Sequence, residues 1–169
     1  MPLIQVEKLK KYKGKRISLF FTEELPALPA GEDGIQPLRE VEYRLSATNA
    51  GTAITVEGMI KVDLRVQCNR CLESFAHPQE IVFQEIYYDR NLHKMGAGEL
   101  DWIPYTGDQI DITPEVVQNI LLNLPMRFLC RDDCVGLCEV CGKDLNKEKC
   151  ACSRDDLDPR LAKLKDLLK

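Results

Sequence analysis

Eight cysteines are the residues of this sequence whose chemistry and spacing are most informative. Cys68 and Cys71 form a C-x2-C pair in the middle of the chain, and six more cysteines follow between positions 130 and 152. These six are Cys130, Cys134, Cys138, Cys141, Cys150 and Cys152. A tight turn between two cysteines presents both thiolates to one ion, and zinc binds four such ligands in a tetrahedron. Because eight thiolates complete two four-ligand sites, we expect two structural zinc ions.

The eight cysteines can be divided between two sites in two ways. In the first division, the four cysteines nearest the C-terminus share a local zinc-ribbon-like site, and the other four share the second site. In the rival division, the four cysteines from Cys130 to Cys141 share a site, while Cys150 and Cys152 join Cys68 and Cys71. The phase of Cys68 favours the first division, because it continues the apolar alternation of residues 60–66 and should point inward.

Two other chemistries use clustered cysteines. An iron–sulfur cluster also takes four thiolates, and the spacing alone does not distinguish it from zinc. A redox C-x2-C pair normally opens a helix of a thioredoxin-like βαβ unit, whereas Cys68 and Cys71 follow a segment with antiparallel-strand alternation. The sequence contains no phosphate loop, nucleophile elbow or H-E-x-x-H motif. We therefore expect a protein without enzymatic activity, with a thiol redox or metal-dependent enzyme using Cys68 and Cys71 as the alternative.

Segments with strand-like alternation precede the cysteine-rich segment. These strands would have to position Cys68 and Cys71. Apolar residues predict a short strand at 17–21, and period-two alternation predicts strands at 41–46, 60–66 and 81–88. Glycine and proline place loops at 22–37 and 89–107, and a turn at Asn49–Gly51 separates two of the strands. These segments together predict an antiparallel sheet, either open or curled toward a barrel.

One strong helix signal lies between the sheet and the later cysteines. Thr113 can cap a helix, Pro114 suits its first position, and an apolar stripe continues to residue 124, just before Pro125. A second, short helix is predicted at 158–168. The fold class is therefore α+β: an antiparallel sheet, one main amphipathic helix and a C-terminal cysteine-rich, zinc-ribbon-like segment. We place the domain boundary between residues 1–129 and 130–169.

Charge and composition narrow the choice of compartment and partner. No run approaches the roughly 18 apolar residues of a membrane span, and the polar N-terminus has no apolar stretch typical of a secretory signal. We therefore expect a cytoplasmic protein with reduced thiols and no membrane or small-molecule partner. The formal net charge of −4 argues against general nucleic-acid binding.

The first sixteen residues are the exception to this acidic balance. They carry a net charge of +5, against −9 for the remainder of the chain. Two zinc–tetrathiolate sites would make the charge of the folded protein about −8, so this segment is the candidate for contact with RNA. Its candidate RNA-binding residues are Lys8, Lys10, Lys11, Tyr12, Lys13, Lys15 and Arg16. The alternative interpretation is an N-terminal strand with a solvated charged face.

Five segments carry a resemblance to a known family: 68–72, 110–112, 124–126, 130–146 and 158–164. From about residue 41 onward the sequence resembles the YceD-like family, the large ribosomal RNA subunit accumulation proteins. The resemblance implies a role in the accumulation or processing of large-subunit ribosomal RNA, without a catalytic residue that can be transferred. The implied partner is ribosomal RNA of the large subunit or a basic large-subunit ribosomal protein. The first 40 residues resemble the family only loosely, so the basic segment inherits no role from it.

Overall fold

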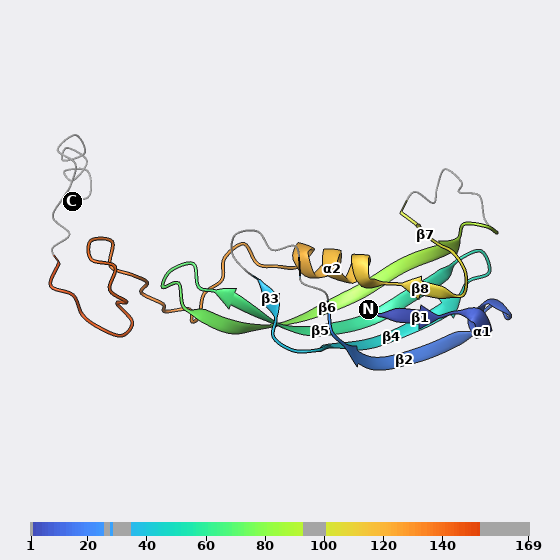
Figure 1. Ribbon diagram of the computed structural model, residues 1–169, viewed down its shortest axis with the longest axis horizontal. Helices are drawn as coiled ribbons and strands as arrows, with labels where there is room; N and C mark the ends of the chain where they lie inside the picture. The colour runs from blue at the N-terminus through green and yellow to red at the C-terminus, as the bar shows by residue number, and fades with distance from the viewer. Residues whose placement is uncertain (1, 26–27, 29–34, 93–100, 153–169) are drawn as a thin grey trace, which may run out of the picture.

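The alternating segments form a mixed sheet in a computed structural model that describes residues 2–25, 28, 35–92 and 101–152 (Figure 1). The strand order is β2-β4-β5-β6-β7, and β3 (Gln36–Pro37) pairs separately with β5. The bounds are β2 (Arg16–Glu23), β4 (Val41–Asn49), β5 (Ile54–Gln67), β6 (Ser74–Asp89) and β7 (Ile103–Tyr105). Every pairing is antiparallel except the parallel pairing of β6 with β7.

The sheet is open. Its order runs from β2 at one end to β7 at the other, and no pairing among the described residues joins these two strands. The barrel-like alternative is therefore wrong, whereas the expectation of a mainly antiparallel sheet with few helices is confirmed. The loop predicted for 89–107 also contains β7, whose short parallel pairing the sequence did not indicate.

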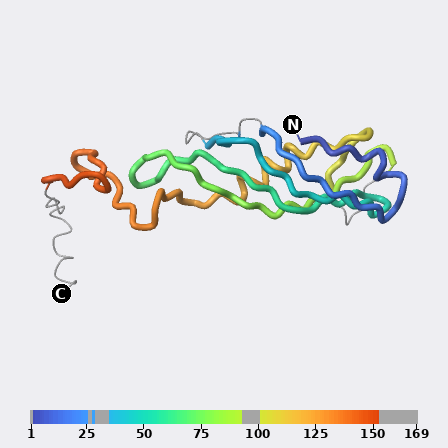
Figure 2. Tube along the Cα trace, turned by 90° about the horizontal axis from the view of Figure 1, so that it is seen from below, coloured from blue at the N-terminus to red at the C-terminus, as the bar shows by residue number. Residues whose placement is uncertain are grey.

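The β5–β6 hairpin provides the longest pairing of the sheet. Its register runs from Ile54↔Tyr87 to Gln67↔Ser74 without interruption. Even-numbered residues of β5 such as Val56 and Ile60 are buried, while odd-numbered ones such as Met59 lie on the other face. The hairpin tip faces the cysteine-rich segment, which extends away from the sheet at one end of the molecule (Figure 2).

One face of the sheet is covered by α2 (Thr113–Leu122) and by a small second sheet. That sheet consists of β1 (Leu3–Gln5) and β8 (Gln109–Asp111), which pair antiparallel. Apolar side chains of these elements join those of β4, β5 and β6 in one core cluster. Its largest fully buried members include Ile4, Leu9, Tyr43, Ile60, Phe83, Tyr87, Ile110 and Ile120.

The N-terminal segment is part of this core. Ile4, Val6 and Leu9 are buried, and Leu9 lies in the short helix α1 (Glu7–Lys10). The buried Asn49 side-chain amide at the end of β4 donates to the carbonyls of Leu9, Lys10 and Tyr12, which fixes the turn after α1. The alternative interpretation of a packed segment with a solvated charged face therefore describes residues 2–16 better than a free arm does.

The main helix begins where the sequence predicts but is capped differently. α2 spans Thr113–Leu122, with Pro114 in its first turn. Thr113 is inside the helix and does not cap it; instead its N–H donates to the Asp111 carboxylate at 2.9 Å. Among the described residues, no helix is long and apolar enough to cross a bilayer. The helix predicted at 158–168 lies outside the described residues, and the predicted domain boundary stays a prediction.

Gly58 yields a test of the close approach between β4 and β5. A Cβ atom built at this position would lie 2.1 Å from the Arg44 carbonyl oxygen and 2.8 Å from the Leu45 Cα. Because backbone atoms cannot move aside as a flexible side chain can, Gly58→Ala should lower the free energy of unfolding by more than about 2 kcal/mol. Urea denaturation would measure this change.

Gly14→Ala is the matched control. Gly14 has a positive φ of 80°, but a Cβ there would meet no atom within 4 Å. It should cost only about 1–2 kcal/mol of backbone strain. Equal stability of wild type and Gly58→Ala would show that the strands separate easily at this point.

Candidate metal centres

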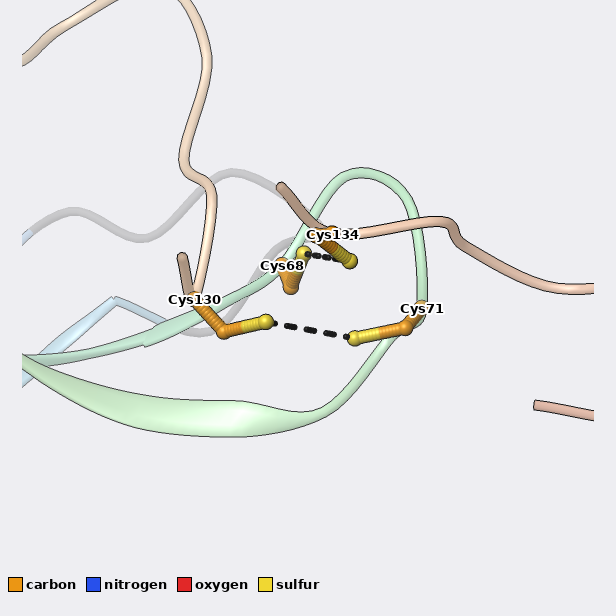
Figure 3. A group of neighbouring side chains, drawn as sticks. All are labelled: Cys68, Cys71, Cys130 and Cys134. Atoms are coloured by element: carbon orange, nitrogen blue, oxygen red, sulfur yellow. Dashed lines mark hydrogen bonds between the residues drawn. The ribbon is translucent and has the colours of Figure 1, made fainter. Parts of the chain in front are cut away.

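The first four-cysteine group joins the β5–β6 turn to the chain that follows α2 (Figure 3). Cys68 and Cys71 come from the turn, while Cys130 and Cys134 come from the later segment. The Sγ atoms of Cys68 and Cys134 are 3.8 Å apart, and those of Cys71 and Cys130 are 3.6 Å apart. All four Sγ atoms lie within 4.8 Å of one another.

A tight backbone turn orients the first two thiols. The N–H of Leu72 donates to the Cys68 carbonyl at 2.9 Å, and the N–H of Cys68 donates to the Glu73 carbonyl at 2.9 Å. Leu72 has a φ of 60°, and it is the one non-glycine residue with positive φ in the described ranges. The N–H of Arg70 points at the Cys68 sulfur, 3.4 Å away. This turn places both sulfurs on its inner side.

Hydrogen bonds from the turn hold the second segment against it. Asn69 exchanges two bonds with Phe128: its N–H donates to the Phe128 carbonyl at 2.8 Å, and its side-chain oxygen accepts from the Phe128 N–H at 2.6 Å. The Arg70 guanidinium donates to the Cys134 carbonyl at 2.7 Å, and the Arg70 carbonyl accepts from Leu137. The four thiols are thus brought together by polypeptide contacts, before any metal is considered.

The second group is local. Cys138, Cys141, Cys150 and Cys152 again have all four Sγ atoms within 4.8 Å of one another, with Cys138 and Cys150 at 3.4 Å. The N–H of Gly142 donates to the Cys138 carbonyl, and Gly142 has a φ of 70°. A positive φ explains why glycine follows the second cysteine of this C-x2-C turn.

These two groups are those of the first division of the cysteines. The rival division is wrong, because Cys130 and Cys134 lie beside Cys68 and Cys71 and not beside Cys138. Cys68 is fully buried, as its phase in the strand predicted, and Cys134 is also buried, whereas Cys141 is exposed. The first group therefore lies inside the protein and the second near its surface.

Asn146 supports the first group, a role that the sequence did not predict. Its side-chain oxygen accepts from the N–H of Val135 and from the Arg131 guanidinium, both at 2.8 Å. Its side-chain NH2 lies 3.5 Å from the Cys134 sulfur and 2.7 Å from an Asp144 oxygen. An asparagine that reaches back to a thiol holds that ligand in place. The only sequence signal for it is the polar run that follows the C-x2-C-Gly turn.

Both groups fit a single tetrahedrally coordinated ion. Ligands about 2.3 Å from a central zinc ion stand roughly 3.8 Å from each other, close to the sulfur separations of 3.4–3.8 Å in the two groups. The donors are four thiols in each case, the set typical of structural zinc. Each group could therefore hold one metal ion with all four positions filled by the protein.

The thiols of each group differ in acidity. Burial opposes ionisation of Cys68, but the N–H groups of Cys71, Cys130 and Arg70 outweigh it and lower the pKa of Cys68 to about 6. The N–H groups of Cys141 and Val140 lower the pKa of Cys138 to about 6. Burial and neighbouring thiols raise the pKa of Cys130 to about 12. Each group thus has one thiol that ionises readily and is primed to accept a cation.

The basic N-terminal residues are placed differently from one another. Lys8, Lys11, Tyr12 and Lys13 are exposed. Lys10 is held in an ion pair with Asp89 at 3.0 Å and lies over the Tyr105 ring. Lys15 lies over the Tyr12 ring, and Arg16 donates to Ser46 and Glu57. Lys10 and Lys15 are thus partly buried, while the other basic side chains are exposed.

By its fold and its candidate site, the chain is an open mixed-sheet protein with two four-thiol groups able to hold metal ions. The family described as "Large ribosomal RNA subunit accumulation protein YceD" matches residues 56–168. The chain is a member of the YceD family, which confirms the resemblance found in the sequence.

Individual relatives agree with this assignment. An uncharacterized protein of Mycobacterium tuberculosis is 26% identical over 98% of this chain and 80% of its own length. The uncharacterized protein YlbN of Bacillus subtilis is 28% identical over 88% of this chain and 86% of its own length. The chloroplastic Large ribosomal RNA subunit accumulation protein YCED homolog 1 of Arabidopsis thaliana is 22% identical, over 89% of this chain and 53% of its own length. No solved structure matches the chain.

Single substitutions should remove one metal ion from each group. We expect two ions per chain in the wild type and one in either Cys71→Ser or Cys141→Ser, counted by inductively coupled plasma mass spectrometry. Cys71→Ser should also lower the melting temperature, because the first group joins two distant segments. Cys141→Ser should leave the melting temperature of the sheet unchanged. A single ion in the wild type would contradict the assignment of two sites.

Acid should release the metal. Metal ligation requires thiolates, and each group contains a thiol, Cys68 or Cys138, whose pKa is lowered from 9.0 to about 6. Stability from a lowered pKa is fully present above the ordinary value and is lost as the pH falls through the lowered one, because protons then compete with the metal for the thiolates. Metal should therefore be retained at pH 7–8 and lost progressively below about pH 6. Dialysis against buffers from pH 4 to pH 8, followed by metal analysis, would measure this. Full occupancy at pH 4 would contradict the assignment of cysteine ligands.

Proposed function

We propose that this protein is a non-enzymatic, cytoplasmic factor in large ribosomal subunit assembly that promotes accumulation of large-subunit ribosomal RNA. Membership of the YceD family, over residues 56–168, carries the proposal. The name of the plant relative places that protein in the same process. Two structural zinc ions, one in each four-cysteine group, would stabilise the fold.

Zinc is favoured over an iron–sulfur cluster by the spacing of the sulfurs. Four Sγ atoms within 4.8 Å of one another surround one ion closely. A cluster of several iron and sulfide ions needs more room between its thiolates. With four protein ligands each, the zinc ions would have no open position for a substrate, which is the arrangement of structural sites.

The burial of the first cysteine pair argues against a redox enzyme. An attacking thiolate needs a low pKa and access to its substrate. The pKa of Cys68 is low, but its side chain is fully buried, and Cys71 is only 6% exposed. These two thiols can hold an ion, while a disulfide substrate cannot reach them.

The charge distribution favours two separate binding surfaces on this protein, one for each kind of partner. The chain has a formal charge of −4, and each zinc–tetrathiolate site would add about −2 relative to neutral thiols. The acidic body would then suit a basic ribosomal protein, while the exposed lysines near the N-terminus would suit ribosomal RNA. Because Lys10 is paired with Asp89, the RNA contacts would come from Lys8, Lys11, Lys13 and Lys15.

Depletion in cells tests the proposed function directly. Loss of the protein should reduce mature large-subunit ribosomal RNA relative to small-subunit RNA, and the wild-type gene should restore the ratio. The Cys71→Ser variant should restore the ratio poorly, because the first four-cysteine group no longer joins the β5–β6 turn to the chain after α2. Quantification of both RNAs by capillary electrophoresis would measure the ratio, and an unchanged ratio after depletion would remove the proposal.

The salt dependence of RNA binding tests the lysines. Replacing Lys8, Lys11, Lys13 and Lys15 by glutamine should weaken binding and reduce the slope of log affinity against log salt by about 3, if each lysine neutralises one phosphate. The control replaces three lysines of the cysteine-rich segment, Lys143, Lys147 and Lys149, and so removes one charge fewer. Equal slopes for the N-terminal variant and the control would leave the N-terminal lysines without a role in RNA binding.

A further inference from the structure

The sheet face opposite α2 carries an exposed row of side chains that the sequence analysis did not single out. The strand registers pair Phe20 with Arg44, Arg44 with Met59, and Met59 with Val82. Phe20 is 70% exposed and Val82 is 75% exposed. These two side chains stand at opposite ends of the row, with Arg44 and Met59 between them. The row is therefore a mixed apolar and cationic surface that crosses four strands.

A hollow of about 610 Å³ lies over this row. Its size suits a small planar group, since ligand pockets range from about 300 to 1,000 Å³. Its lining combines apolar and polar groups, and it includes Arg16, Ser18, Phe20, Arg44, Ser46, Glu57, Gly58, Val82 and Gln84. The strand backbones approach closely at Gly58, where an added Cβ would meet the Arg44 carbonyl.

The aromatic ring already has a cationic neighbour. The Arg44 guanidinium lies 5.4 Å from the centre of the Phe20 ring, and it also pairs with Glu42 at 3.6 Å. Aromatic rings and guanidinium planes are the groups on which proteins stack unpaired bases. The hydroxyls of Ser18 and Ser46, and the amide of Gln84, offer donors and acceptors to the edge of a base.

The charge around the hollow favours a nucleic acid. The two arginines of the hollow are each paired, Arg16 with Glu57 at 3.0 Å and Arg44 with Glu42 at 3.6 Å, so the positive charge that favours RNA comes from the turn before β2. Arg16 is also the first residue of β2, directly after the basic turn that contains Lys11, Lys13 and Lys15. Lys13 and Lys15 of that turn thus lie close in sequence to the Arg16 end of the hollow. A purely apolar protein segment would gain nothing from these lysines.

Resting on the proposed role in ribosome assembly, we propose that this hollow binds an unpaired base of single-stranded RNA, stacked on Phe20, with the flanking phosphates on the basic turn. Recognition is of single strands, because a paired base cannot leave its stack to enter the hollow without losing its partner. The lysines contribute affinity that salt screens, while the hollow contributes the preference for unpaired bases.

Binding of a short labelled RNA tests this assignment. The probe is a fluorescein-labelled ten-nucleotide RNA of mixed sequence, titrated with the full metal-loaded chain and followed by anisotropy. Phe20→Ala should weaken binding about 5- to 100-fold, since a stacked base loses its platform. Phe20→Tyr should restore most of it, because the ring is kept. The matched control Leu122→Ala removes a 74%-exposed apolar side chain of α2 and should change nothing.

Duplex RNA and protein capture complete the test. A duplex of the same sequence should bind more weakly than the single strand. Its affinity should be the same for the wild type and for Phe20→Ala. Equal single-strand affinity for wild type and Phe20→Ala would overturn the inference. So would a Phe20→Ala variant that binds RNA normally and loses only a co-purified ribosomal protein. Melting temperatures of all variants would verify that the fold is intact.

Complementation separates failure of this inference from failure of the proposed function. In depleted cells the wild-type gene should restore large-subunit RNA, and the Phe20→Ala gene should restore it poorly. Full restoration by Phe20→Ala would overturn the base-binding site and leave the assembly role standing. If depletion itself leaves the RNA unchanged, the assembly role fails, and the anisotropy measurements still decide whether the hollow binds RNA.

Discussion

The tip of the β5–β6 hairpin is held by a contact between segments that are distant in sequence. Cys68 meets Cys134 across 66 residues, and Cys71 meets Cys130 across 59. A two-stranded ribbon that extends beyond the rest of a sheet is marginally stable on its own. The returning chain stabilises it through Asn69, Phe128 and the Arg70–Cys134 bond. Closing a loop of this length costs entropy, which a metal ion shared by four thiolates would offset.

The two four-cysteine groups therefore have different structural duties. The first connects the sheet to the C-terminal segment and is largely buried, so its loss would affect distant parts of the fold. The second is closed within 15 residues of sequence and includes the exposed Cys141. It organises only its own segment. Asn146 lies in sequence between Cys141 and Cys150 of the second group, yet its side chain contacts Cys134 of the first.

The sequence predicted the inner face of the sheet better than its extent. Alternation at 60–66 is regular, but β5 begins at Ile54 and includes Gly58, which interrupts the pattern. Likewise the sequence predicts a strand at 81–88, but β6 begins at Ser74 and includes Pro78. Pro78 is tolerated because, among the described residues, β7 pairs only with the far end of β6, which leaves this part of β6 as an edge.

The sequence predicted which cysteines belong to the candidate metal groups, but only the fold shows how they are divided between the two groups. The spacing of the cysteines along the chain does not show which later pair lies at the hairpin tip. That depends on how α2 packs against β6, because the chain after α2 carries the later cysteines. The same holds for the exposed row on the other face. Phe20 lies in an apolar run that reads as core, and only the register with Arg44 and Met59 places it outside.

The separation of the first group along the chain has a consequence for biosynthesis. Translation at about 5–20 residues per second takes roughly 3–12 s to pass from Cys71 to Cys130, 59 residues later. For that interval the hairpin tip presents two thiols without their later partners, within reach of oxidants and of stray metal ions. For the second group the interval is about fourfold shorter, because only 14 residues separate Cys138 from Cys152.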